Sequence, residues 1–470
     1  MSAPSEMRDR EPRRLLVARD SNLAERSLMS RDQAQAILEK VKKASKADEV
    51  TINLASRHAT DVRFAANQLS TSGGVWNTVL TVTSAFGKRH GSASVNDLSN
   101  ESIGRVVAQS ESLAKLSPED PEWMPLLGPQ RYQPVDAYVD ATARLTPADR
   151  ARAALTALEP ARKAGDLQAA GFLTVEATSN AVGNSRGLFA YHRSTRANYT
   201  LTVRTADGTG SGWAGAEAND WSSIDFAKVS ETAIEKARRS RNPVAIEPGR
   251  YTVILEPQAV ADLVQPMAGA LSARRADEGR SAFAKSGGGN RIGDRIVDPR
   301  ITLISDPRDP QLLTAPFDHE GSPADRTAWI ENGVLRQLVY SRYWAEKQRK
   351  PANAAPGSVK LLGGPTSMDE MIRSTPRGIL VTRLFYLRQV DPRTILYTGL
   401  TRDGTFQIED GKIARAIKNF RFNESPLAML DRLEAVGPAV RVAGTESEGV
   451  VVVPPLKVRD FNFTSLSDAV

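Results

Sequence analysis

Histidine and cysteine, the residues that most often bind transition metals, are scarce in this sequence. The chain has no cysteine, which excludes disulfides, a thiolate nucleophile, an iron–sulfur cluster and a cysteine-ligated zinc site. A metal site built from this chain alone would therefore need histidine together with carboxylates. The four histidines, His58, His90, His192 and His319, lie far apart in the sequence. For the first three we expect surface or core roles rather than metal binding.

The fourth histidine forms the only His-Glu pair, His319-Glu320. A helical zinc-peptidase motif needs a second histidine about one turn further on, so that both imidazoles reach one metal while the glutamate activates water. Here Gly321 and Pro323 stand where the helix would have to continue. The zinc-peptidase motif is therefore absent at this position.

Glycine and serine provide no better site. The four glycines in the stretch 207–215 are not followed by an apolar helix start, and the glycines at 287–289 lack the Lys-Ser/Thr of a phosphate-binding loop. We interpret both stretches as flexible hairpin tips. The stretch 208–212 lacks the Gly-x-Ser-x-Gly spacing, and the flanking strand and helix, of an elbow that presents a serine nucleophile. Without knowledge of a family, the chain shows no self-sufficient active site.

The elements that position these residues follow from hydrophobic periodicity. Ser30 is typical of an N-cap, and the apolar spacing after it predicts a helix over 31–47. Alternation of apolar and polar residues then predicts strands at 50–55, 62–66, 78–86 and 92–95, with turns at 72–74 and 87–88. A second amphipathic helix is expected at 101–116. We therefore predict an N-terminal α+β domain over 28–117, preceded by a flexible arm at 1–27.

Five prolines between 117 and 134 predict a linker, which opens a middle α+β domain over 118–246. Thr146-Pro147 is typical of an N-cap and first helical residue. From 247 to 470 we predict a β-rich domain, with one helical stretch over 257–276 that Pro266 kinks. The fold class is therefore α+β.

The composition limits the partners. The net charge of +7 is dispersed, with the densest basic runs near predicted helix ends, which argues against nucleic acid as a partner. No apolar run approaches the roughly 20 residues that span a bilayer, and the charged N-terminus does not resemble a secretory signal. We expect a cytoplasmic protein with no membrane contact.

Three segments of the C-terminal half resemble the TldD/PmbA family, also called modulators of DNA gyrase. Two of them are Ile-Glu-(Asn/Asp)-Gly hairpins, and this pair is distinctive although either turn alone is common; the segments are 317–321, 329–335 and 406–413. The resemblance extends over roughly 30–465.

The resemblance also implies which arm of the family this is. The TldD-like arm carries a His-Glu-x-x-x-His helix and a late cysteine as zinc ligands, whereas the aligned positions here hold Val264, Gln265 and Gly269, and cysteine is absent. The chain therefore resembles the TldE/PmbA-like arm. That implies a heterodimer with a TldD-like subunit that binds the zinc, no metal or catalytic residue in this chain, and unfolded peptides as substrate.

Several residues are candidates for touching peptide or partner. We expect the loop around His319 to line a cavity or contact the partner, with tight-loop packing as the alternative. We expect two arginines further on to contact a peptide carboxylate, with surface ion pairing as the alternative. The candidates are Phe317, Asp318, His319, Glu320, Gly321, Arg326, Arg383 and Arg402. Two other functions stay open. One is a stand-alone peptidase with an atypical metal bound by His319, His192 and carboxylates, and the other is a homodimeric peptide-binding protein or topoisomerase modulator.

Overall fold

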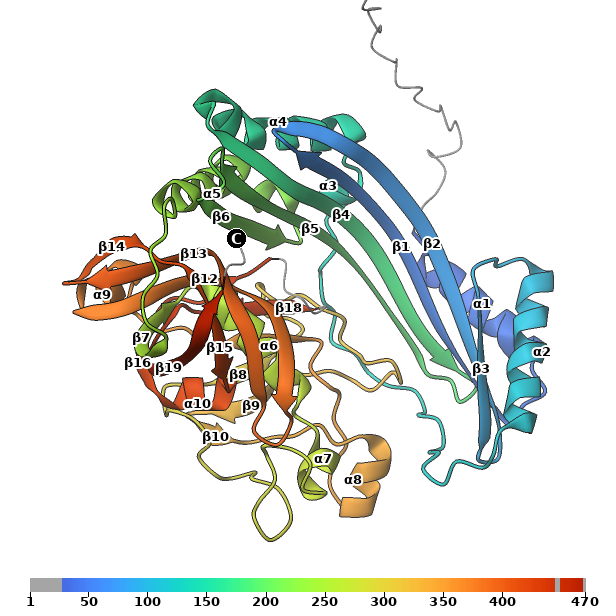
Figure 1. Cartoon of the computed structure of the whole chain (residues 1–470). Helices are drawn as coiled ribbons and strands as arrows, with labels where there is room; N and C mark the ends of the chain where they lie inside the picture. Colours follow the sequence, from blue (N-terminus) through green and yellow to red (C-terminus); the bar gives the residue numbers. More distant parts are fainter. Residues whose placement is uncertain (1–27, 444–448, 468–470) are drawn as a thin grey trace, which may run out of the picture.

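A long, curved antiparallel sheet arches over a β-rich C-terminal half in the computed structural model, which describes residues 28–443 and 449–467 (Figure 1). The predicted arm at 1–27 lies outside the described residues. Helices and sheets are both abundant, and the C-terminal half is mostly strand, so the predicted α+β class with a β-rich C-terminal region is confirmed.

The curved sheet has six strands in the order β3-β2-β1-β4-β5-β6. Its strands are β1 (Glu49–Ala65), β2 (Gln68–Phe86), β3 (Arg89–Val95), β4 (Leu167–Asn184), β5 (Phe189–Thr205) and β6 (Ser211–Ala218). Because β1 pairs with β4, strands from the predicted N-terminal and middle domains form one sheet. The division of the chain at 117/118 stays a prediction.

Two predicted turns in this sheet are wrong. The turn expected at 72–74 lies inside β2, where Gly73 and Gly74 pair with Asp61 and Thr60 of β1. The hairpin tip expected over 207–215 is a turn only at its start, since β6 begins at Ser211. In both places pairing with a distant strand outweighs the local preference of glycine for turns.

All the helices of this half pack on one face of the curved sheet. They are α1 (Arg31–Ala44), α2 (Asn100–Leu116), α3 (Asp140–Ala143), α4 (Pro147–Ala164) and α5 (Phe226–Arg239), with a short 3₁₀ turn η2 (Trp221–Ser223). The predicted caps are confirmed, because Ser30 and Thr146 each accept the backbone N–H of the third helical residue and complete a capping box.

Alternation along β4 and β5 gives the sheet two different faces. Leu173, Val175, Leu201 and Val203 point into the core beneath the helices. The residues between them are polar over most of this length and face the C-terminal half. The concave face of the sheet is therefore hydrophilic.

The C-terminal half contains two further sheets around one core. The first has the order β10-β9-β8-β11-β18-β17, made of β8 (Leu303–Ser305), β9 (Thr327–Glu331), β10 (Val334–Leu335), β11 (Ser358–Leu361), β17 (Val440–Arg441) and β18 (Val450–Val453). The second closes on itself through the β12–β13 pairing, and consists of β7 (Gly249–Leu255), β12 (Arg377–Asp391), β13 (Leu396–Glu409), β14 (Lys412–Ala416), β15 (Asn419–Glu424), β16 (Leu433–Val436) and β19 (Leu456–Ser467).

Helix α6 lies between these sheets and is buried on nearly all sides. The single helix predicted over 257–276 is two helices, α6 (Pro257–Gly269) and α7 (Ala273–Asp277), and α6 continues past Pro266. The shorter helices are α8 (Arg342–Gln348), α9 (Met368–Arg373) and α10 (Pro426–Asp431). Within the described residues, no helix combines the length and apolarity needed to cross a membrane.

Both hairpins that carry the family resemblance are present. The β9–β10 turn has positive φ at Asn332 (50°) and Gly333 (77°), and the β13–β14 turn at Asp410 (48°) and Gly411 (75°). Two successive positive φ angles define the type I′ turn, which matches the twist of the flanking strands. The predicted hairpins are confirmed.

Candidate functional site

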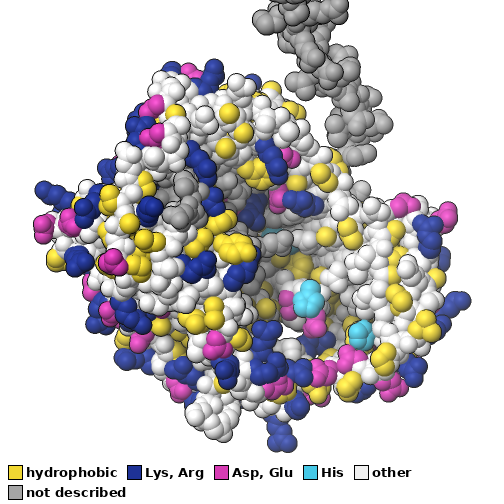
Figure 2. All heavy atoms as spheres, in the orientation of Figure 1, with side chains coloured by type: hydrophobic (Ala, Val, Ile, Leu, Met, Phe, Trp, Pro, Cys, Tyr) yellow, Lys and Arg dark blue, Asp and Glu magenta, His cyan; other side chains and the backbone are white. Residues whose placement is uncertain are grey.

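The concave face of the curved sheet forms the floor of a cavity of about 850 Å³. Side chains of β4 and β5 make the floor, and the loop at 313–315 together with β17 and β18 makes the opposite wall. Figure 2 shows the molecule hollowed near the centre of the face that it presents. We call this cavity the hollow.

Two smaller cavities adjoin the hollow. One, of about 550 Å³, shares Thr314 and Ala315 with it and lies beside Phe317 and Asp318. The other, of about 380 Å³, shares Gly449 and Val450 with the hollow and lies at the end of α6. The three cavities are therefore neighbours that share lining residues.

A buried ion cluster joins the two halves of the molecule at one wall of the hollow. Arg441 of β17 donates to Oε1 of Glu217 in β6 from Nη2 and Nε, at 2.9 and 3.1 Å. Arg196 donates from Nε to Oε2 of Glu217 at 2.7 Å, and Asn198 donates to the same oxygen at 3.0 Å. Burial lowers the pKa of Arg441, and the Glu217 carboxylate opposes that shift. This cluster positions the β17 edge over the sheet.

His192 lines the hollow and is buried, with 6% of its surface exposed. Its Nε2 has no hydrogen-bond partner among the residues that the structure describes. Burial lowers the pKa of His192 to about 4, so the imidazole is neutral at physiological pH. A neutral imidazole has one N–H donor and one acceptor nitrogen.

The position of His192 predicts that acid weakens the folded state. Between its ordinary pKa of 6.5 and its folded value of about 4, the unfolded chain binds a proton that the folded chain does not. Stability is therefore fully present above pH ~6.5 and falls as the pH drops towards 4, by about 3 kcal/mol. We expect His192→Gln to lack this part of the loss, measured from urea unfolding at pH 7 and pH 4.5. An unchanged pH dependence would contradict the prediction.

The predicted loop at 317–321 lies where the curved sheet meets the C-terminal half. Phe317 packs against Val182, Leu188 and Ala190 and lines the 550 Å³ cavity. Oδ1 of Asp318 accepts the backbone N–H groups of residues 320 and 322, both at 2.9 Å, so the tight-loop alternative describes its contacts. A contact of this loop with peptide or partner stays a prediction.

The remaining loop candidates are less enclosed. His319 and Glu320 are exposed on the same loop, and Arg326 is exposed just before β9. The carbonyl of Gly321 accepts a hydrogen bond from the Tyr132 hydroxyl at 2.7 Å. The structure thus brings the 317–321 candidates together, whereas Arg326 lies at the start of the next strand.

Arg383 and Arg402 lie elsewhere, on either side of the buried Asp403. Their side-chain nitrogens are 3.1 and 3.8 Å from Oδ2 of Asp403, and their guanidinium carbons lie 5.9 and 4.2 Å from the centre of the Phe385 ring. Neither arginine lines the three neighbouring cavities. Their role in binding a peptide carboxylate stays a prediction.

The α6 positions aligned with zinc ligands do not suit a metal. Val264 is fully buried among apolar side chains, and Gly269 has no side chain and faces open space. Gln265, at the glutamate position, borders the 380 Å³ cavity but its amide cannot act as a general base. In the described ranges, 28–443 and 449–467, no group of three or more His, Asp or Glu side chains could hold a metal ion.

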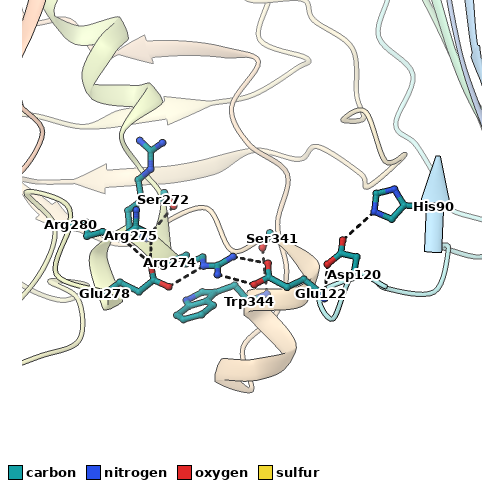
Figure 3. Close-up of polar contacts among 10 residues, drawn as sticks. All are labelled: His90, Asp120, Glu122, Ser272, Arg274, Arg275, Glu278, Arg280, Ser341 and Trp344. Carbon is teal, nitrogen blue, oxygen red and sulfur yellow. Dashed lines mark hydrogen bonds and ion pairs between the residues drawn. The ribbon is translucent and has the colours of Figure 1, made fainter. Parts of the chain in front are cut away.

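The predicted linker is a strap that crosses between the halves (Figure 3). Glu122 accepts two hydrogen bonds from Arg274 of α7, at 2.7 and 2.8 Å, and Arg274 also contacts Glu278. Two residues earlier in the same strap, Asp120 lies 3.2 Å from Nε2 of His90 in β3. These contacts hold the strap against both halves.

Sequence reasoning missed the residues that build the hollow. Glu217 and Arg441 are 224 positions apart, and no local pattern connects them. The alternation along 172–180 and 192–200 was a usable signal, because polar residues at every second position predict a hydrophilic sheet face. What that face meets depends on tertiary structure.

Comparisons with known proteins agree with this architecture. The chain is similar to a metalloprotease of Methanothermobacter thermautotrophicus, with 26% identity over 293 residues that cover 56% of this chain and 61% of that protein. It is also similar to metalloprotease PmbA of Escherichia coli O157:H7, with 22% identity over 405 residues, 81% of this chain and 85% of the relative.

Its fold matches the crystal structure of TldE from Thermococcus kodakarensis with a TM-score of 0.83 at 21% identity, over 92% of this chain and 99% of that one. Two family profiles also match: the PmbA/TldA metallopeptidase central domain at residues 138–241, and the PmbA/TldA metallopeptidase C-terminal domain at 248–465. Since these matches cover most of its length, the chain belongs to the PmbA/TldD metallopeptidase family.

Proposed function

We propose that this chain is the non-catalytic, substrate-enclosing subunit of a cytoplasmic heterodimeric zinc metallopeptidase. The complex trims or degrades unfolded peptides and small proteins. The zinc and the catalytic groups belong to a TldD-like partner subunit, and this chain supplies walls that enclose the substrate.

The observation that carries the proposal is the set of side chains at the end of α6. Val264 is packed in the core, Gly269 faces a cavity, and Gln265 has an amide in place of a carboxylate. A zinc peptidase needs imidazole or carboxylate ligands and a group that activates water. The neighbouring cavities support a role in enclosing substrate, because they provide concave space without that chemistry.

The test is to purify this chain and a candidate TldD-like subunit, separately and together. Zinc content and cleavage of an unfolded peptide are measured for each chain and for the mixture. We expect cleavage from the mixture alone, with zinc stoichiometric to the partner. A partner variant that lacks one zinc-binding histidine is the control, and its mixture should not cleave.

Other outcomes would overturn the proposal. If this chain alone binds zinc and cleaves peptide, the assignment from the α6 side chains is wrong, and His319 is the first residue to mutate. If it forms a homodimer that binds peptide and never associates with the partner, it is a stand-alone binding protein. A steep salt dependence of DNA affinity would favour a topoisomerase modulator.

A further inference from the structure

The floor of the hollow is a regular array of side chains. On β4 and β5, five directly opposed pairs point to the concave face, from Phe172 opposite Thr200 at one end to Asn180 opposite His192 at the other. The array spans eight residue steps of an extended strand, or about 26 Å at ~3.3 Å per residue. An extended peptide of similar length would fit along it.

Charges around the floor are already paired with one another. Arg57 contacts Glu176 across β1 and β4, and Glu217 is shared by Arg196 and Arg441. Each carboxylate has a cationic partner, and these three arginines exceed the two carboxylates by only one charge, so the floor selects only weakly for the charge of a ligand. The recognition groups that remain are hydroxyls, side-chain amides and one neutral imidazole.

His192 is the member of this array with unmet hydrogen-bonding capacity. Its side chain lines the hollow, and its Nε2 has no partner among the described residues. A buried polar atom without a partner costs about 1–3 kcal/mol, so a group that enters the hollow and satisfies it is favoured. Asn180, directly opposite on β4, is exposed and carries both a donor and an acceptor.

We propose that the β4–β5 floor of this chain binds the main chain of an extended polypeptide, with Asn180 and His192 hydrogen-bonding its peptide groups at one end. A peptide group offers one N–H and one C=O, which match an amide side chain and a neutral imidazole. Main-chain recognition requires no particular sequence, as suits a subunit that encloses unfolded substrates. This inference deepens the proposed function and rests on it for the class of ligand.

The test uses the full chain without a partner and a fluorescein-labelled, unstructured ten-residue peptide, with binding followed by fluorescence anisotropy. We expect Asn180→Ala and His192→Leu each to raise Kd about fivefold, the effect of one lost hydrogen bond, because neither new side chain can donate or accept one. Thr202→Ala is the matched control, because Thr202 lies on the same strand and face but outside the hollow, and should leave Kd unchanged. Urea unfolding at pH 7 confirms that each variant is folded.

Two further probes separate main-chain recognition from other modes. A peptide with ester bonds in place of several amides should bind at least fivefold more weakly, since it lacks N–H donors. Peptides of net charge −2 and +2 should bind within about threefold of each other at 0.15 M salt. Equal binding of the ester, or binding of only one charge, overturns the inference.

The outcome is separable from that of the proposed function. If the mixture with the zinc subunit cleaves peptide but Asn180→Ala and His192→Leu bind as the wild type does, the floor inference is wrong while the subunit role stands. If the chain binds peptide through these residues but never forms an active complex, the inference stands and the subunit role fails.

Discussion

Replacing Glu217 by alanine should lower the free energy of unfolding by about 3–5 kcal/mol, among the largest effects of any polar substitution in this chain. The side chain of Glu217 is 2% exposed, and the variant would leave Arg196 and Arg441 facing each other across the wall of the hollow without a counter-charge. Arg441 is itself largely buried, so water cannot easily replace the lost carboxylate. Urea unfolding followed by tryptophan fluorescence measures the loss.

Two matched variants show whether the uncompensated charge is the cause. Replacing all three residues by apolar side chains of similar size should recover most of the loss, because no charge is then buried alone. The exposed pair Glu235–Arg239 on α5 is the control, and Glu235→Ala should cost ~0.5 kcal/mol or less. A Glu217→Ala variant that unfolds like the Glu235→Ala variant would contradict the prediction.

The second large effect is expected at Gly212, where α5 lies directly on the backbone of β6. A Cβ on Gly212 would stand 2.2 Å from the carbonyl oxygen of Ala233 and 2.4 Å from the backbone N of Ala237. Both atoms belong to the helix backbone, so no side-chain rotation can relieve the contact. We expect Gly212→Ala to destabilise the fold by about 3 kcal/mol, and Gly212→Val by more.

A glycine-to-alanine substitution at Gly104 should change the free energy of unfolding in the opposite direction. Gly104 is exposed in α2 and a Cβ there would meet no atom within 4 Å. Gly104→Ala should therefore stabilise the protein by about 0.5–1 kcal/mol, because alanine loses less conformational entropy in a helix. Thermal unfolding of the two alanine variants side by side checks both signs. If Gly212→Ala melts at the wild-type temperature, α5 does not pack as closely as the structure indicates.

Much of the fold was predictable because its causes are local. Ser30 and Thr146 begin helices because their side chains cap N–H groups only two or three residues away. The Asn332-Gly333 and Asp410-Gly411 turns form hairpins because these residue types tolerate positive φ. The α+β class, the β-rich C-terminal region and the family resemblance rest on such short-range signals.

Features that depend on distant partners were not predictable in the same way. The glycines at 73 and 74 are typical of a turn, but pairing with β1 keeps them in a strand. The sequence predicts that Gly212 belongs to a flexible hairpin tip, whereas in the structure the backbone of α5 packs directly against it. In each case contacts made in the folded state outweigh a backbone preference of about 1 kcal/mol.

The concave region likewise combines features that the sequence predicts with features that only the tertiary structure determines. Alternation along the sequence is enough to make one face of β4 and β5 hydrophilic. The family resemblance identifies positions 264, 265 and 269 as those of the zinc-site residues, and the residue types there argue against zinc in α6. That the hydrophilic face closes against β17, with Glu217 bridging Arg196 and Arg441, follows from packing between segments more than 200 residues apart. Burial in the folded protein also keeps His192 neutral and leaves its Nε2 without a hydrogen-bond partner among the described residues. Desolvation and pairing of charges arise only when those segments meet, so no short stretch of sequence encodes them.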